Sequence, residues 1–270
     1  MDSPGINWST ASTAEVRRAL SRGISAQITR ALEVLDDHRD VASSVHEARR
    51  AIKRERALLR LVEPPPSDSF VDGALREASR ALAVLRDSDV LVATAVTVCD
   101  GSRRLGPDVV PPQLLEALEE ERKRRFGGSG SNDSPLREAG QILRSAADAV
   151  ADNPALGAMP DGAQASTPTS GGTAPPDAME LLRLGLGASY ESVRAQSRPD
   201  PDPRSGDEQS HKLRKRVKDL RYQLEFLASC ETKFGRLVRD LRHLTDLLGD
   251  RNDLAMLLGY TASAMWSAPP

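Results

Sequence analysis

Two segments of this chain, 165 residues apart, carry the same pattern of basic side chains. The first is His46-Glu-Ala-Arg49-Arg50-Ala-Ile52-Lys53-Arg54-Glu-Arg56, and the second is His211-Lys-Leu-Arg214-Lys215-Arg-Val217-Lys218-Asp-Leu-Arg221. Histidine, arginine, lysine and arginine occupy relative positions 0, 3, 7 and 10 in both segments. A chain with such a repeat is expected to fold as two related halves, because each copy specifies the same local structure.

The spacing within each segment places the basic side chains on one face of a helix. At roughly 100° per residue, the four positions lie within an arc of about 80° and extend over about 15 Å. Apolar residues follow the opposite face: Ala48, Ile52, Leu59 and Val62 in the first copy, and Leu213, Val217, Leu220, Leu224 and Leu227 in the second. Each segment therefore predicts an amphipathic helix with a buried apolar stripe and a basic face.

Positive charge is concentrated in these two segments. Residues 46–60 hold six Lys/Arg against two Glu, a net charge of +4, and residues 211–225 hold six Lys/Arg against one Asp and one Glu, again +4. The whole chain has a net charge of −2. Like charges at this density repel one another, and an anion would relieve the repulsion. A basic stripe can also be a solvated face without a ligand, but two copies with the same spacing favour a binding function.

The rest of the chain is patterned as helices. They are predicted over residues 13–38, 43–62, 69–99, 111–126, 134–151, 178–197, 207–230, 233–248 and 251–266. The run Val90 to Val98 is rich in β-branched residues but is also assigned to a helix, because no neighbouring segment would pair with it as a strand. Residues 152–177 contain five Pro and four Gly and predict a flexible linker. The expected domains are an N-terminal half, 13–151, this linker, and a C-terminal half, 178–268.

Composition narrows the class of protein. An aromatic content of 3% with abundant Ala, Leu, Arg and Glu favours an all-α fold. Two cysteines, Cys99 and Cys230, make no disulfide framework and favour a reducing, cytoplasmic location, although a bridge between them stays open. The longest apolar stretch has ten residues, whereas a membrane span needs about 20, and residues 1–10 lack the pattern of a secretory signal.

The repeat and three further elements resemble the CHAD family, the conserved histidine α-helical domain. These elements are Arg221-Tyr222-x-x-Glu225, Leu85-Arg86-Asp87-Ser88-Asp89-Val90 and Leu248-Gly249-Asp250-Arg251-Asn252-Asp253. The resemblance covers residues 13–266 and implies two four-helix-bundle-like halves, related by a pseudo-twofold, around a central basic channel. It also implies that the channel binds inorganic polyphosphate and that the protein associates with polyphosphate granules.

The expected polyphosphate-binding residues come from both copies of the repeat. They are His46, Arg49, Arg50, Lys53, Arg54, Arg56 and Arg60 in the first copy, and His211, Arg214, Lys215, Lys218, Arg221 and Tyr222 in the second. Arginines can direct two N–H donors at phosphate oxygens, lysines act as point charges, and the histidines can donate a hydrogen bond.

A metal site is the main alternative chemistry for these residues. The two histidines with Asp87, Asp89, Asp250 and Asp253 resemble a metal-ligand set, but the adjacent cations would repel a metal ion. The aspartates fit other roles better: Asp250 as the cap of a helix that begins after Gly249, or orientation of the arginines.

The remaining motifs favour a protein without catalytic activity. Gly127-Gly128-Ser-Gly is not followed by Lys-Ser/Thr, and the chain has no nucleophile elbow or zinc spacing. We therefore expect a non-enzyme without a cofactor or resident metal. Scarce aromatics argue against single-stranded nucleic acid as the ligand. The alternatives are nucleic-acid binding and a role as regulatory partner of a triphosphate- or polyphosphate-metabolising enzyme.

Overall fold

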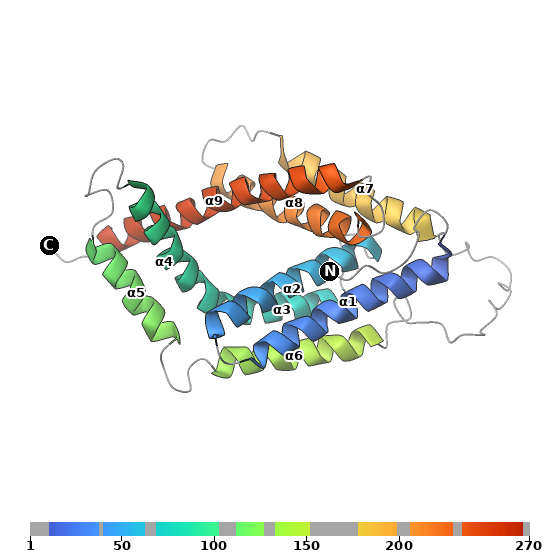
Figure 1. Ribbon diagram of the computed structural model, residues 1–270, viewed down its shortest axis with the longest axis horizontal. Helices are drawn as coiled ribbons and strands as arrows, with labels where there is room; N and C mark the ends of the chain where they lie inside the picture. The colour runs from blue at the N-terminus through green and yellow to red at the C-terminus, as the bar shows by residue number, and fades with distance from the viewer. Residues whose placement is uncertain are drawn as a thin grey trace.

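The computed structural model describes residues 11–37, 40–62, 69–102, 112–126, 133–151, 178–198, 206–228 and 234–266 (Figure 1). Its long elements are all helices, which confirms the all-α prediction: α1 (Thr13–Leu35), α2 (Val41–Val62), α3 (Phe70–Ala81), α4 (Ala83–Ser102), α5 (Pro112–Phe126), α6 (Asp133–Ala151), α7 (Ala178–Gln196), α8 (Gly206–Ala228) and α9 (Gly235–Trp266). The predicted linker, residues 152–177, and Cys230 lie outside the described ranges.

The repeat extends beyond the two basic segments. The first residues of α1, α2 and α3 are 13, 41 and 70, and those of α7, α8 and α9 are 178, 206 and 235, so each pair begins at the same offset of 165 as the basic motifs. α2 and α8, which carry the basic faces, are therefore the second helices of two matching series. α4, α5 and α6 follow the first series and precede the second.

Local sequence fixes the starts of three helices. Ser12 and Glu15 form a capping box, in which the Ser12 hydroxyl accepts from the Glu15 amide and the Glu15 carboxylate accepts from the Ser12 amide. Asp40 accepts from the amide of Ser43 at the start of α2, and Ser69 caps α3. These side chains satisfy backbone N–H groups that have no partner within the helix.

The prediction of one helix over residues 69–99 was wrong, because α3 ends at Ala81 and α4 begins at Ala83. No Gly or Pro marks this break. In the last turn of α3 the carbonyl of Ser79 accepts a hydrogen bond from the Arg49 guanidinium of α2. A side chain from another helix therefore supplies a donor at the end of α3, which the local sequence does not reveal.

The prediction of two helices over residues 233–248 and 251–266 was also wrong, because α9 runs continuously from Gly235 to Trp266. Gly249 had suggested a helix end, but it lies inside α9 against Arg214 of α8. A Cβ added at Gly249 would lie 3.1 Å from Arg214 Nη2. The missing side chain makes room for an arginine, and Asp250, in the helix interior, does not cap a helix start.

The largest core belongs to a four-helix bundle of α1, α2, α3 and α6, seen at the bottom of Figure 1. The predicted apolar stripes are confirmed where they are described, because Ala48, Ile52, Leu59, Val217, Leu220, Leu224 and Leu227 are all buried, whereas Leu213 is half-buried. Two α8 residues, Phe226 and Leu227, enter this core, so the C-terminal half is packed directly on the N-terminal bundle.

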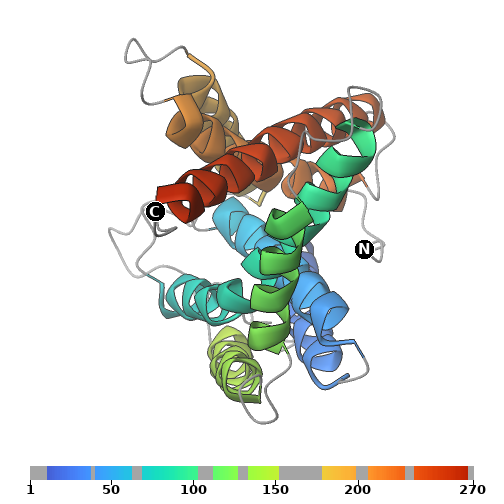
Figure 2. The ribbon, with the colours of Figure 1, turned by 90° about the vertical axis from the view of Figure 1, so that its left-hand side faces the viewer.

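Two smaller cores complete the fold. Val217, Leu220 and Leu224 of α8 pack against Val238 and Leu241 of α9. At the near end of the molecule in Figure 2, α4 and α5 pack against the C-terminal part of α9 through Val92, Ala95, Leu118 and Leu257. α4 thus leaves the bundle and joins α9, so that the residues at its start face both halves. None of the described helices is both long and apolar enough to cross a lipid bilayer.

Two glycines allow close contacts between the halves. A Cβ added at Gly185 of α7 would lie 2.7 Å from the Cα of Leu61 in α2 and 2.9 Å from its carbonyl carbon. A second glycine, Gly23 of α1, faces the ring of Phe226, where an added Cβ would lie 2.6 Å from Cε2. Because the Leu61 atoms are backbone, the contact at Gly185 cannot be relieved by a rotamer change.

We expect Gly185→Ala to lower the free energy of unfolding by about 1–3 kcal/mol, because overpacking outweighs the gain in helix propensity. The matched control is Gly187→Ala, two residues further along α7, where an added Cβ meets nothing within 4 Å. That change should raise stability by up to about 1 kcal/mol. Chemical denaturation of both variants provides the measurement, and equal effects of the two substitutions would contradict the assigned α7–α2 contact.

Candidate functional site

The two basic helix faces meet at equivalent lysines. Lys53 of α2 and Lys218 of α8 occupy the same position of the repeat, and the positive charge of Lys218 lowers the pKa of Lys53. Burial is the largest cause of this shift, and Arg49, Arg86 and Arg214 add to it, so that the pKa of Lys53 falls to about 7. The ammonium group of the half-buried Lys53 is therefore held among four other cations.

Lys218 lies in a similar environment. Burial, followed by the charges of Arg214, Arg221 and Arg86, lowers its pKa to about 8, whereas Asp253 acts in the opposite direction. We call this group of six cations the cationic cluster: Arg49, Lys53, Arg86, Arg214, Lys218 and Arg221. Two members come from α2, one from α4 and three from α8.

Arg49 and Arg214 are equivalent positions of the repeat that are held in different ways. Arg49 donates to the Ser79 carbonyl at the end of α3, and burial, followed by the charge of Arg86, lowers its pKa to about 10. Arg214 lies over Gly249 with its Nη1 3.9 Å from Oδ1 of Asp253. The suggestion that these aspartates orient arginines thus agrees with the position of Asp253.

Arg86 is the binding candidate that the sequence analysis missed. Its charge lowers the pKa of His46, Arg49, Lys53, Arg214 and Lys218, so it lies near residues from both copies of the repeat. Its Nη1 is 3.6 Å from Oδ1 of the adjacent Asp87. In the sequence, the Leu85–Val90 element suggests a role for its aspartates but not for this arginine. Arg86 follows the unpredicted α3–α4 break by four residues, so its direction could not be inferred from a straight helix.

Tyr222 supports two arginines and is itself buried. Its ring centroid is 4.6 Å from Cζ of Arg221 and 5.6 Å from Cζ of Arg54. Only 3% of Tyr222 is exposed, so its ring is a surface on which guanidiniums from α8 and α2 lie, as in cation–π contacts. Glu225 lies nearby, 3.7 Å from Nε of Arg221, and accepts a hydrogen bond from Arg242 of α9.

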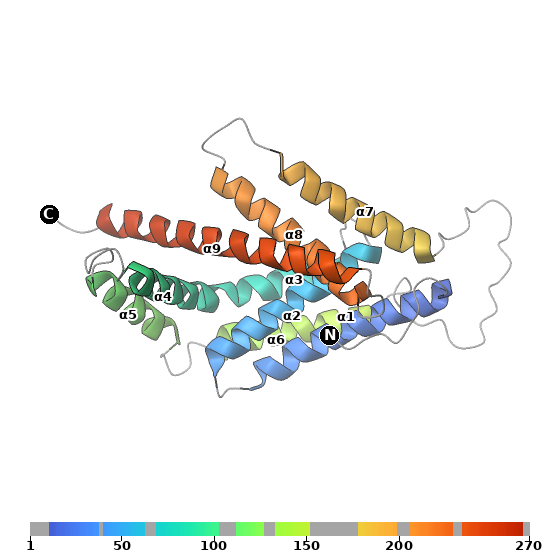
Figure 3. The same ribbon diagram turned by 45° about the horizontal axis from the view of Figure 1, so that its top comes forward.

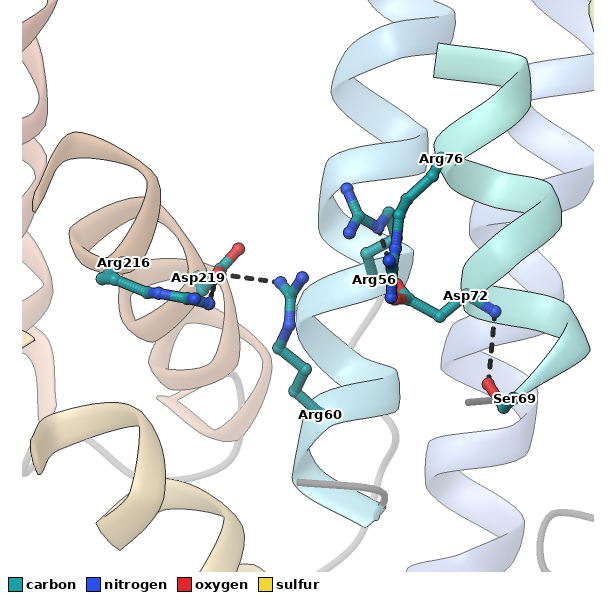
Figure 4. Close-up of polar contacts among 7 residues, drawn as sticks. All are labelled: Arg56, Arg60, Ser69, Asp72, Arg76, Arg216 and Asp219. Carbon is teal, nitrogen blue, oxygen red and sulfur yellow. Dashed lines mark hydrogen bonds and ion pairs between the residues drawn. The ribbon is translucent and has the colours of Figure 1, made fainter. Parts of the chain in front are cut away.

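Arg56 and Arg60 lie further along the basic face of α2 than the cluster and are engaged in ion pairs (Figure 4). Arg56 donates to Asp72 of α3 at 2.7 Å, and Asp72 also accepts from Arg76. Arg60 contacts Asp219 of α8 at 2.8 Å, and Arg216 lies 3.8 Å from the same carboxylate oxygen. Both carboxylates are mostly buried, so these pairs join α2 to α3 and to α8.

The two repeat histidines differ in their surroundings. The Nδ1 of His211 lies 2.6 Å from Oδ1 of Asn252 in α9, a distance that fits a ring N–H donating to the amide oxygen. Partial burial lowers the pKa of His46, and the charges of Arg86, Arg50 and Lys53 lower it further, although Glu47 opposes them. The cluster thus disfavours a charged imidazole at His46.

The remaining predicted residues lie around the cluster. Arg50 and Lys215 are exposed, and Arg50 pairs with Glu47 at 3.1 Å. Arg54 is half-buried, and burial is the main cause that lowers its pKa. The Nε–H groups of Arg49, Arg54, Arg214 and Arg221 are buried without a hydrogen-bond partner among the described residues. Buried donors of this kind favour an acceptor, which an anion would provide.

The positions of the aspartates bear on the alternative of a metal site. Within the ranges that the structure describes, no three His, Cys, Asp or Glu side chains gather as a metal-ligand set. Asp87 and Asp253 each lie beside an arginine, and Asp89 contacts Arg122 of α5 at 2.9 Å. The repeat residues thus gather cations rather than a set of metal-binding carboxylates.

Comparison with known proteins finds a matching family model and a similar solved structure. The family model of the CHAD domain matches residues 18–260. A solved structure, the crystal structure of the CHAD domain from the plant Ricinus communis, matches with a TM-score of 0.54 and 18% sequence identity. The match covers 96% of this chain and 82% of that one, and it supports the fold. The search of curated proteins finds no match.

We expect Lys53→Met to stabilise the free protein at pH 6 by about 0.5–2 kcal/mol, since it removes a charge that the cluster disfavours. The unfolded chain protonates this lysine below about 10.5, whereas the folded chain does so only below about 7. Between these values the unfolded state binds more protons, so wild-type stability rises with pH. The advantage of Lys53→Met should therefore shrink between pH 7 and pH 10.

Denaturation curves at several pH values would measure this difference. Lys212→Met is the control, because Lys212 is exposed on α8 and pairs with Glu208 at 2.8 Å. Such an exposed pair contributes little, so the control should change stability by less than about 0.5 kcal/mol at any pH. A Lys53→Met variant that is less stable than wild type at pH 6 would contradict the proposed electrostatics.

Proposed function

The chain belongs to the CHAD domain family, and we propose that it binds inorganic polyphosphate through the cationic cluster without hydrolysing it. The observation that carries this proposal is the position of the half-buried Lys53 beside Lys218 and three arginines. The fold keeps these cations together although their charges repel, and a polyanion at the cluster would turn that repulsion into attraction.

The distribution of the cations favours an extended anion over a single small one. The cluster draws side chains from α2, α4 and α8, and the exposed Arg50 and Lys215 continue it on both basic helices. A chain of phosphates can contact several of these groups at once, with arginines donating paired hydrogen bonds and lysines contributing point charges. Release of counterions from such a polymer would make the affinity depend steeply on salt.

We propose a modified set of binding residues. Arg56 and Arg60 are already paired with Asp72 and Asp219, so we assign them to holding α2 in place. Arg86 joins the set because its charge lowers the pKa of Lys53 in one half and of Lys218 in the other. Tyr222 contributes indirectly, as the surface that supports Arg54 and Arg221.

A binding role without catalysis fits the charge of the site. Hydrolysis of phosphoanhydrides commonly uses divalent cations held by carboxylates, and the cluster would repel such ions. Polyphosphate binding would place the protein in the cytoplasm, at polyphosphate granules. Nucleic acids are also polyanions, and the low aromatic content disfavours them as ligands because it leaves few rings on which bases could stack.

We expect Lys218→Gln and Arg86→Gln each to weaken binding of long-chain polyphosphate about tenfold or more, since each removes a charge-assisted contact. Each should also reduce the slope of log affinity against log salt by about one. Lys212→Gln, on the exposed side of α8, is the matched control. Titration calorimetry or fluorescence anisotropy provides the affinities. Unchanged affinity in both cluster variants, or equal affinity for single-stranded RNA at equal phosphate concentration, would contradict the proposal.

We also expect polyphosphate binding at pH 8 to take up about one proton per protein, because the bound anion raises the pKa of Lys53 and Lys218 from about 7 and about 8. Calorimetry in buffers with different ionisation enthalpies measures this number directly. At pH 6 both lysines are already protonated, so their part of the uptake should vanish. Binding at pH 8 without proton exchange would show that the anion does not reach these lysines.

A further inference from the structure

A row of leucines lies on the outer side of α9, away from every core. Leu237, Leu244, Leu247, Leu254 and Leu258 are exposed by 46%, 37%, 54%, 45% and 69%. With Asp240 and Arg251, which are also exposed, they occupy positions separated alternately by three and four residues over three heptads. This spacing is that of the a and d positions of a coiled coil. We call these seven residues the α9 stripe.

The stripe is not needed for the fold of the single chain. The opposite side of α9 supplies the buried residues, among them Val238, Leu241 and Leu257, and also carries Gly249 and Asp253 of the site. Figures 1 and 3 show α9 along the outside of the molecule with its outward side uncovered by another described helix. Five exposed leucines in one row form an apolar surface that is larger than scattered surface residues require.

The polar residues of the stripe identify what covers it. If two copies of α9 lie antiparallel with the twofold axis between Thr245 and Asp246, then Leu237 faces Leu254 and Leu244 faces Leu247 of the other copy. In the same register Asp240 faces Arg251, and the twofold repeats this pair on the other side of the axis. Every position of the stripe from residue 237 to residue 254 thus meets a complementary one.

From this complementarity we infer that the chain forms an antiparallel homodimer through the α9 stripe. A closed twofold interface requires a surface that is complementary to itself. The stripe meets this requirement, because its leucines face leucines and its aspartate faces its arginine. A parallel pair would place Asp240 opposite Asp240 and Arg251 opposite Arg251, which is repulsive. The residues that flank the stripe also favour the antiparallel pair. In this register Arg236 of one copy and Asp250 of the second copy lie along the same edge of the interface.

The dimer leaves the proposed polyanion site accessible. The cationic cluster faces the inner side of α9, through Arg214 at Gly249 and Asp253, whereas the stripe is on its outer side. Two clusters would then lie on opposite sides of the dimer. Arg251 lies 3.4 Å from Asp207 within its own chain, but this pair is exposed and can be exchanged for Asp240 of the second copy at little cost.

The test is sedimentation equilibrium of the full chain, for which we expect twice the mass of 29.2 kDa at micromolar to tens of micromolar concentration. The double variant Leu244→Glu/Leu247→Glu should sediment as a monomer with an unchanged helical circular-dichroism spectrum. The matched control is Val84→Glu, at an exposed apolar residue of α4 outside the stripe, which should leave the dimer intact. A monomeric wild-type chain, or a dimer that persists in the double variant, would overturn the inference.

Charge exchange tests the register independently of the leucines. Asp240→Arg alone and Arg251→Asp alone should each raise the dimer dissociation constant about tenfold or more, because each places like charges opposite one another. The combined variant should restore the wild-type constant. Residues 240 and 251 are three helical turns apart in one chain and cannot contact each other, so recovery requires the antiparallel pair. Failure of the combined variant to recover would overturn the proposed register.

Discussion

The burial of like charges where α2 faces α8 is the constraint on which the rest of this structure depends. Lys53 and Lys218 lie half-buried among arginines, and the lowered pKa values of both lysines express how strongly the folded state disfavours their charge. A chain that only needed to be stable would place apolar residues there. Groups that oppose stability in this way are typical of sites that bind a ligand of the opposite charge.

The packing around the cluster explains how these charges stay together. Arg56–Asp72 and Arg60–Asp219 tie α2 to its neighbours just beyond the cluster, and the buried Gln223 of α8 donates to the Ala57 carbonyl of α2 at 2.9 Å. Phe226 adds an apolar contact by inserting beside Gly23. The residues of α2 and α8 thus divide into two groups: one fixes the distance between the helices, and the other holds the unneutralised charge.

The two halves of the repeat serve the site differently. In the first, the chain breaks at Leu82, so that α4 diverges from the bundle and carries Arg86 toward both basic helices. In the second, α9 stays continuous and passes Gly249 and Asp253 along Arg214, while its far side presents the leucine stripe. One unbroken helix therefore contacts the cationic cluster with one face and carries the exposed leucines on the other.

The sequence by itself determined the all-α fold, the place of most helices, the buried stripes of α2 and α8, and the family, because each rests on local periodicity or on motif order. It also named five of the six cluster cations. The break at Leu82, the continuity through Gly249, the role of Arg86 and the ion pairing of Arg56 and Arg60 were decided by tertiary structure. The physical reason is common to all four: each depends on a side chain that arrives from a different helix, and periodicity along one helix contains no information about that neighbour.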